Sequence, residues 1–180
     1  YNASSMLLLP DLLGYFLTGV KTTEMTIAGT SCLMENRQEN WSIEVARRFG
    51  IPEKLYTEIV EPRTFKGNLR QEIQIQTGMK NTRLVATVGH DSAAAVAAIP
   101  DFGENKLYIS IGTNVSMGVE RSECLLSREG YLKGFKNTGG IDRKKIIYRD
   151  FSACWHLNEF IRTRKEQGIT YSFVDLINMA

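Results

Sequence analysis

The feature that most constrains the fold is the apolar run LVATV, residues 84–88. Hydrophobic residues follow one another here instead of alternating with polar ones, which is typical of a strand covered on both faces. We therefore predict an interior strand of an α/β sheet over residues 83–88. The turn Gly-His-Asp follows it directly and ends in Asp91. Because ligands of open α/β sheets bind beyond the carboxyl ends of the strands, Asp91 is a candidate general base.

The next segment predicts a helix and then a boundary. Residues 92–98 read SAAAVAA, and such small side chains allow a helix to lie close to its neighbours. Asp91 stands at a natural N-cap position for this helix, so a capping role also explains it. His90 has two interpretations too, as a donor to a ligand hydroxyl or as a partner of the local backbone. The sequence PDFGEN, residues 100–105, predicts a hinge.

A second turn lies between two short strands. We predict strands over residues 107–111 and 115–119, joined by Gly112, Thr113 and Asn114. Successive backbone N–H groups and a hydroxyl in this turn could bind phosphate oxygens. The same tripeptide is also favourable hairpin chemistry, so both interpretations stay open.

The rest of the chain favours short helices that end at glycines. Apolar spacing and start signals predict the helices, and Gly19, Gly50 and Gly78 follow the first three of them. Residues 131–147 are rich in Gly and Lys and predict loops with short strands. The predicted helices cover residues 7–17, 43–49, 69–76 and 151–165.

Composition excludes several classes of function. The chain has 22 basic and 20 acidic residues and a net charge of +2, which gives no support to nucleic-acid binding. Neither a signal peptide nor a membrane span is predicted. Three widely spaced cysteines fit reduced thiols in the cytoplasm, and no metal-binding pattern stands out. The chain begins without Met and ends inside an apolar pattern, so we expect a piece of a longer protein.

The order of these motifs resembles a known family. The stretches GHDSAAAVAAIP and YISIGTNVSMGVE are similar to the FGGY carbohydrate kinases, most closely to their rhamnulokinase members, in which GSHDTASAV and a Ser-Gly-Thr-Trp turn recur at this separation. The resemblance implies an α/β, actin-like ATPase (ribonuclease H-like) fold, with sugar and ATP between two domains. It assigns residues 1–101 to the C-terminal part of the sugar-binding domain and residues 102–180 to the beginning of the ATP-binding domain.

The resemblance also implies roles for individual residues. Asp91 would accept the proton of the attacking sugar hydroxyl, and His90 and Ser92 would lie beside it at the ketose. Gly112 and Thr113 would approach the terminal phosphates of Mg-ATP.

Further nucleotide contacts would lie at Asp150 and Asn158, where the family typically carries Asn and Gln. Asp150 would replace a neutral amide by an anion that only accepts hydrogen bonds. From the residues alone, Asp150 is explained as a helix N-cap and Asn158 as part of a solvated helix face. Ile111 and Asn114 also depart from the Ser and Trp that usually flank Gly-Thr.

The expected activity is transfer of the γ-phosphoryl group of ATP, with Mg²⁺, to a primary hydroxyl of L-rhamnulose or a similar ketose. The alternatives are a kinase for another sugar, such as fuculose or xylulose, and a non-catalytic sugar sensor on a decayed kinase scaffold. Sugar and ATP are the expected partners, without nucleic acid or membrane. The family's phosphate loop and adenosine motif belong to parts absent from these 180 residues. We therefore expect no kinase activity from this segment alone.

Overall fold

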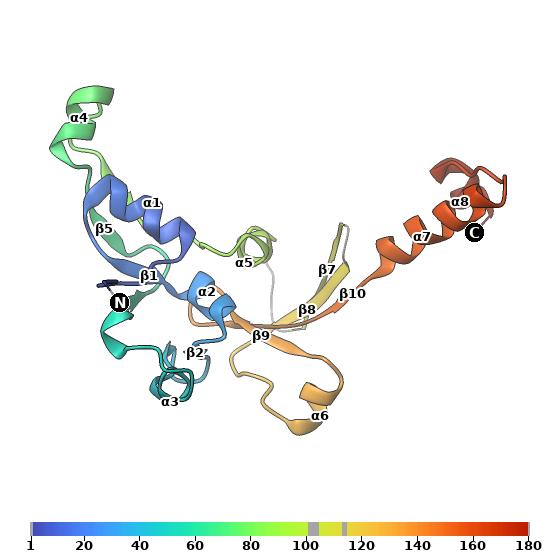
Figure 1. The fold of residues 1–180 in the computed structure, drawn as a ribbon, viewed down its shortest axis with the longest axis horizontal. Helices are drawn as coiled ribbons and strands as arrows, with labels where there is room; N and C mark the ends of the chain where they lie inside the picture. The colour runs from blue at the N-terminus through green and yellow to red at the C-terminus, as the bar shows by residue number, and fades with distance from the viewer. Residues whose placement is uncertain (1, 101–104, 113–114, 180) are drawn as a thin grey trace.

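The computed structural model describes residues 2–100, 105–112 and 115–179 (Figure 1). Within this part of the chain, short helices alternate with small sheets in the N-terminal half, and one larger sheet dominates the rest. The N-terminal elements are α1 (Leu9–Thr18), β1 (Thr22–Glu24), α2 (Met25–Ala28), β2 (Met34–Glu35), β3 (Asn40–Trp41), α3 (Ile43–Arg48), β4 (Glu58–Val60), β5 (Phe65–Asn68), α4 (Gln71–Thr77), β6 (Arg83–Val85) and α5 (Asp91–Ala97), with 3₁₀ turns at Gly29–Ser31 and Glu53–Leu55.

The later elements form an antiparallel sheet and two terminal helices. The sheet order is β7-β8-β10-β9, and α7 leads away from the sheet toward the C-terminus (Figure 1). These elements are β7 (Leu107–Ile111), β8 (Val115–Arg121), α6 (Arg128–Leu132), β9 (Lys136–Gly139), β10 (Lys145–Phe151), α7 (Ala153–Glu166) and α8 (Phe173–Met179).

The predicted helices are confirmed, and their ends have the expected chemistry. Gly19 follows α1 with a φ of 84°, and Gly78 follows α4 with a φ of 73°, the left-handed conformation that glycine adopts without strain. The hydroxyl of Ser42 accepts a hydrogen bond from the Val45 amide at 3.4 Å and so caps α3. The helix predicted over residues 151–165 begins at Ala153, because β10 continues to Phe151.

The prediction of an interior strand over residues 83–88 is wrong for the described chain. β6 ends at Val85, whose side chain is 49% exposed, and β6 pairs only with β5. Ala86 still exchanges backbone hydrogen bonds with residues 63 and 64, and the amides of Gly89 and His90 then donate to side chains of residues 24 and 26 instead of to a neighbouring strand. An apolar run alone does not reveal such side-chain acceptors.

The strands predicted over residues 107–111 and 115–119 are confirmed as the hairpin β7–β8, in which Ile111 pairs with Val115. Thr113 and Asn114 of the connecting turn lie outside the described residues, as do residues 101–104 of the predicted hinge. Helix α5 packs on this sheet through Ala93 and Val96, which form a buried cluster with Ile146 of β10. This packing places the start of α5 against one face of the sheet.

Ion pairs also connect the β9–β10 turn to the N-terminal half. Arg63 pairs with Asp142 at 3.1 Å. Arg143 pairs with Glu61 at 2.7 Å. All four side chains are largely exposed, so these contacts orient the turn more than they stabilise the fold.

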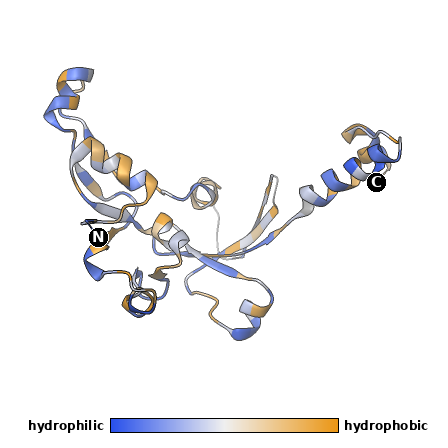
Figure 2. Cartoon of the chain, in the orientation of Figure 1, coloured by the Kyte–Doolittle hydropathy of each residue, from blue (hydrophilic) through white to orange (hydrophobic). Residues whose placement is uncertain are grey.

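Apolar side chains also remain on the outside of several helices. Hydrophobic residues occur along α1 (Figure 2), and three of them, Leu9, Leu13 and Phe16, are more than half exposed. Their spacing at i, i+4 and i+7 places them on one face of the helix. In the described residues, no helix is both long and apolar enough to cross a membrane.

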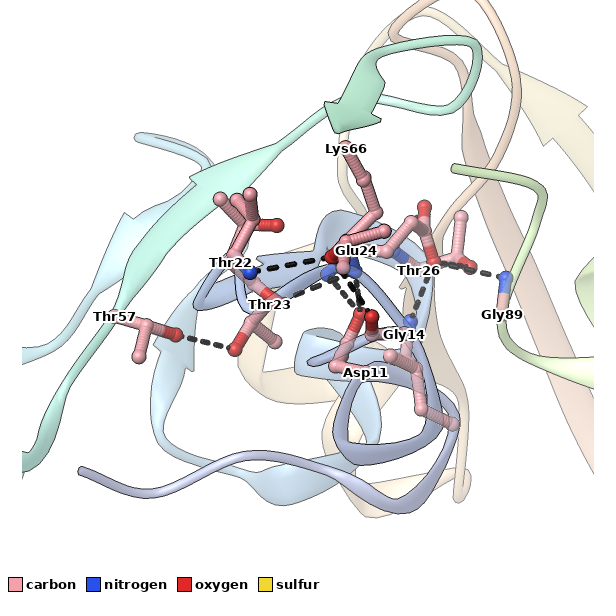
Figure 3. Close-up of polar contacts among 12 residues, drawn as sticks. Asp11, Gly14, Thr22, Thr23, Glu24, Thr26, Thr57, Lys66 and Gly89 are labelled. Carbon is pink, nitrogen blue, oxygen red and sulfur yellow. Dashed lines mark hydrogen bonds and ion pairs between the residues drawn. The ribbon is translucent and has the colours of Figure 1, made fainter. Parts of the chain in front are cut away.

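A buried ion pair holds the N-terminal half together (Figure 3). The Lys66 ammonium on β5 lies 2.7 Å from Oδ1 of Asp11 on α1, and both side chains are almost fully buried. Lys66 also donates to the Thr22 carbonyl at 3.3 Å, and Asp11 Oδ1 accepts from the Glu24 amide at 3.1 Å. One charged pair therefore joins α1, β1 and β5.

Removing the cation of this pair should destabilise the protein strongly. In Lys66→Met the Asp11 carboxylate stays buried without its counter-charge, a change that costs about 3–5 kcal/mol. Thermal unfolding of the complete protein that carries this chain measures the effect. The matched control is Lys133→Met, which removes an exposed pair with Glu129 and should cost only about 0.3–0.5 kcal/mol. Equal losses in the two variants would contradict the prediction.

Candidate active site

A pocket of about 320 Å³ lies between the start of α5 and the four-stranded sheet. Its walls come from both sides of the predicted hinge, because α5 precedes residues 100–105 and the strands follow them. The lining residues are His90 just before α5, Ser92 and Ala93 from α5, Tyr108 and Ser110 from β7, Ser116 from β8, Thr138 from β9, and Ile146, Tyr148 and Asp150 from β10.

The register of the sheet explains why these side chains share one face. Ser116 pairs with Ser110 on one side and with Asp150 on the other, so the three lie in one row across the sheet. Two residues along each strand, Gly118 lies between Tyr108 and Tyr148. Directly opposed residues and those at i+2 point to the same face.

The pocket is lined by several side chains that can form hydrogen bonds. Burial raises the pKa of Tyr108 and of Tyr148 above the ordinary value for tyrosine. Both phenols are protonated at neutral pH, and the Tyr108 phenol is hydrogen-bonded to the Ser116 side chain. With the hydroxyls of Ser110 and Ser116, they suit a ligand that carries many oxygens.

Two further polar atoms on the pocket wall have no partner among the described residues. They are Oγ1 of Thr138, whose residue is only 4% exposed, and Nδ1 of His90. Buried polar atoms are normally satisfied, since an unmade hydrogen bond costs about 1–3 kcal/mol.

Asp150 lies in β10 and not at a helix start, so its interpretation as an N-cap is wrong; Ser152 occupies the N-cap position of α7. The strand continues past residue 150 because that residue is paired with Ser116 in the ladder. Lys136 donates to the Asp150 carboxylate at 2.8 Å, and this hydrogen bond raises the pKa of Lys136. The ammonium offsets the anion at this edge of the pocket.

Asp91 is the first residue of α5, and the N-cap position belongs to His90. The helix begins one residue earlier than expected because the His90 carbonyl accepts from the Ala94 amide at 2.9 Å. The capping explanation of Asp91 is therefore wrong. Its side chain is 97% exposed, accepts from the Ser92 amide at 2.7 Å and lies 3.7 Å from Nε2 of His90. The carboxylate is free to face solvent beside two pocket-lining residues.

The structure does not bring every predicted site residue to the pocket. His90, Ser92 and Asp150 line it, and Asp91 lies next to it in sequence. Gly112 lies just beyond β7, at the same sheet end as Asp150, and is exposed. Asn158 is exposed on α7, in agreement with a solvated helix face. The functional roles of all these residues stay predictions.

Sequence reasoning missed most of the polar wall. The missed residues lie on four strands: Tyr108 and Ser110 on β7, Ser116 on β8, Thr138 on β9 and Tyr148 on β10. Alternation within each strand was the available signal, because residues two apart face the same side. Pairing between strands that are distant in sequence decides which alternating sets meet.

Among the described residues, no cluster of three or more His, Cys, Asp or Glu side chains could hold a metal ion. Cys32 and Cys124 are free thiols. The pocket as described thus combines hydroxyls, an imidazole and a neutralised carboxylate, a set suited to binding a polyhydroxy or phosphorylated ligand.

Comparison with known proteins identifies the family. Residues 1–98 match the N-terminal domain of the FGGY family of carbohydrate kinases, more than half of the chain. The chain belongs to this family. The resemblance found in the sequence is thereby confirmed.

Relatives that align with nearly the whole of this chain agree with this assignment. A rhamnulokinase from Enterococcus faecalis is 31% identical over 99% of this chain, and one from Bacteroides thetaiotaomicron is 34% identical over 99%. The chain spans only 35% and 36% of the lengths of these FGGY relatives. A solved Plasmodium falciparum glycerol kinase with ADP superimposes with a TM-score of 0.72 at 17% identity, covering 87% of this chain and 32% of that one. The predicted actin-like ATPase fold is confirmed for this part of the FGGY chain.

The pocket wall of this FGGY protein depends on Gly118, and this can be tested. A Cβ at Gly118 would lie 2.6 Å from the Tyr108 ring and 2.7 Å from the Ile147 carbonyl. Gly118→Ala should therefore destabilise the sheet by about 1–3 kcal/mol and displace Tyr108. Thermal unfolding measures the first effect. The control is Gly139→Ala in β9, where the nearest atoms lie at 3.6 Å and little change is expected. Similar stability of the two variants would show that Tyr108 does not need this space.

Proposed function

We propose that the complete protein carrying this chain is an ATP-dependent sugar kinase that phosphorylates a primary hydroxyl of L-rhamnulose or a similar ketose. The supporting observation is the composite pocket, in which His90 and Ser92 from one side of the predicted hinge meet Asp150 and the hydroxyls of the sheet. Membership of the FGGY family and the rhamnulokinase relatives favour this activity over other uses of such a pocket.

The proposed division of labour follows the chain. Residues 1–101 would complete the sugar-binding domain, and residues 102–180 would begin the ATP-binding domain. The family model for the N-terminal domain matches residues 1–98, close to this boundary. Phosphoryl transfer between two such domains relies on positioning and electrostatic stabilisation more than on covalent chemistry by the protein.

On the sugar side, Asp91 would accept the proton of the attacking hydroxyl. Its carboxylate is exposed beside the pocket, and among the described residues its partners are its neighbours His90 and Ser92, so it is available to a ligand. His90 and Ser92, which both line the pocket, would orient the sugar by hydrogen bonds. A general base has to lie within hydrogen-bond reach of the proton that it takes.

On the nucleotide side, Gly112, Thr113, Asp150 and Asn158 would contact ATP, which with Mg²⁺ supplies the phosphoryl group. The hydroxyls of Ser110 and Ser116 fit a phosphorylated ligand at this end of the sheet. Lys136 would limit repulsion between Asp150 and the phosphates, because the ammonium already compensates the carboxylate.

The role of Asp91 can be tested by Asp91→Asn in the complete protein. The amide cannot accept the proton, so turnover should fall by roughly 100- to 10,000-fold while sugar affinity changes little. Coupled ADP-release assays with L-rhamnulose, L-fuculose and D-xylulose measure turnover and sugar preference. Asp142→Asn, an exposed carboxylate on the β9–β10 turn, is the matched control and should retain full activity. Unchanged turnover in Asp91→Asn would overturn the assignment.

The negative charge of Asp150 should lower the affinity for Mg-ATP, and this can be tested. Asp150→Asn removes an anion near the phosphates and releases Lys136, so both effects should tighten Mg-ATP binding severalfold. Lys136→Gln leaves Asp150 uncompensated and should weaken binding. Isothermal titration calorimetry on the complete protein measures both. Sugar binding without Mg-ATP binding in the unaltered protein would instead favour the non-catalytic sensor.

A further inference from the structure

A buried carboxylate outside the pocket binds the backbone just before Asp91 (Figure 3). Glu24 is only 2% exposed, and its Oε2 accepts from the Gly89 amide at 2.9 Å. The same carboxylate accepts from the amides of Thr26 and Ile27 and from the Thr26 hydroxyl. Glu24 thus connects the start of α2 to a loop 65 residues further along the chain.

Thr26 continues this connection to the next residue of the loop. Its hydroxyl donates to Glu24 at 2.5 Å and accepts from the His90 amide at 3.2 Å. Thr26 is fully buried, so solvent does not compete for these bonds. Two successive amides, those of Gly89 and His90, are therefore held by side chains from a distant part of the fold.

Gly89 is required for this close approach. A Cβ at residue 89 would lie 2.9 Å from Oε2 of Glu24 and 3.2 Å from Ile27. Any larger residue would push the loop away from the carboxylate. The absence of a side chain at residue 89 therefore allows the Gly89 amide to reach the Glu24 carboxylate.

Within the part of the chain that the structure describes, Asp91 has no comparable anchor of its own. The contacts that fix its carboxylate are to its neighbours Ser92 and His90, and its side chain is 97% exposed. Its place relative to the pocket is consequently set by the backbone of residues 89 and 90 and by the packing of α5. Misplacement of a reacting group by 1 Å can cost about 100-fold in rate.

We propose that Glu24 and Thr26 are positioning residues, which hold the Gly89–His90 backbone so that the Asp91 carboxylate faces the ligand. They act through Asp91 and touch neither sugar nor nucleotide. This inference rests on the proposed role of Asp91 as general base. It assigns a function to Glu24 and Thr26, which belong neither to the sequence motifs nor to the lining of the pocket.

The sharpest test compares Thr26→Val with Thr26→Ser in the complete protein. Valine keeps the shape but leaves the His90 amide without its acceptor, whereas serine keeps the hydroxyl. We expect kcat to fall roughly 10- to 100-fold in Thr26→Val with KM for the sugar nearly unchanged, and to be restored in Thr26→Ser. Thermal unfolding controls for general loss of structure. A fall in unfolding temperature with unchanged kcat would overturn the proposal.

Glu24→Gln provides a second variant of the same network. Each carboxylate oxygen of Glu24 accepts from at least one backbone amide, so either orientation of a glutamine amide would place its NH₂ against an N–H donor. We expect kcat to fall at least as far as in Thr26→Val. Retention of wild-type kcat in both variants would exclude the network from positioning the base.

A double variant distinguishes this inference from the proposed function. If Thr26 acts through Asp91, adding Thr26→Val to Asp91→Asn should cause no further loss of the residual rate. A further loss equal to that in the single Thr26→Val variant would overturn the positioning role. If Asp91→Asn leaves turnover intact, the assignment of Asp91 as general base fails. If Asp91→Asn loses turnover but Thr26→Val stays fully active, only the positioning role of Glu24 and Thr26 is rejected.

Discussion

The chain of buried polar contacts from Lys66 through Asp11 to Glu24 is the interaction on which the N-terminal half depends. Lys66 neutralises Asp11, and Asp11 accepts from the Glu24 amide. Glu24 in turn holds the Gly89 amide. Buried charges are tolerated when they are paired and hydrogen-bonded, so the Lys66–Asp11 pair favours one arrangement of α1, β1 and β5. The same arrangement places the Glu24 carboxylate next to the loop ahead of α5 and so links this packing to the local geometry at Asp91.

The pocket depends on a different principle, the two-residue period of strands. Tyr108, Ser110 and Ser116 share a face with residues of β10 because the hairpin and the β8–β10 ladder bring them into register. Helix α5 then closes that face through Ala93 and Val96. Its small side chains permit the close approach, and His90 and Ser92 thereby reach the hydroxyl-rich wall. The two halves of the chain each contribute groups that neither could use alone.

Local signals in the sequence were sufficient for the helices, the hairpin and the family. Glycine stops, the Ser42 cap and strand alternation act within a few residues, so they can be read without the fold. The interpretations that failed involved competition between distant groups. The strand predicted over residues 83–88 ends at Val85, and the amides of Gly89 and His90 donate to Glu24 and Thr26 instead of to a neighbouring strand. Asp150 stayed in a strand because Ser116 paired with it.

The sequence by itself determined that this chain carries an FGGY kinase motif, with Asp91 after a Gly-His turn and Asp150 at a predicted nucleotide position. Only the tertiary structure decided what surrounds these residues. It paired Asp150 with Lys136, left the Asp91 carboxylate exposed, and brought Thr138 of β9 to the same pocket as His90. The physical reason is that charge compensation, burial and hydrogen-bond satisfaction depend on neighbours brought together by long-range packing, which residue order does not specify locally.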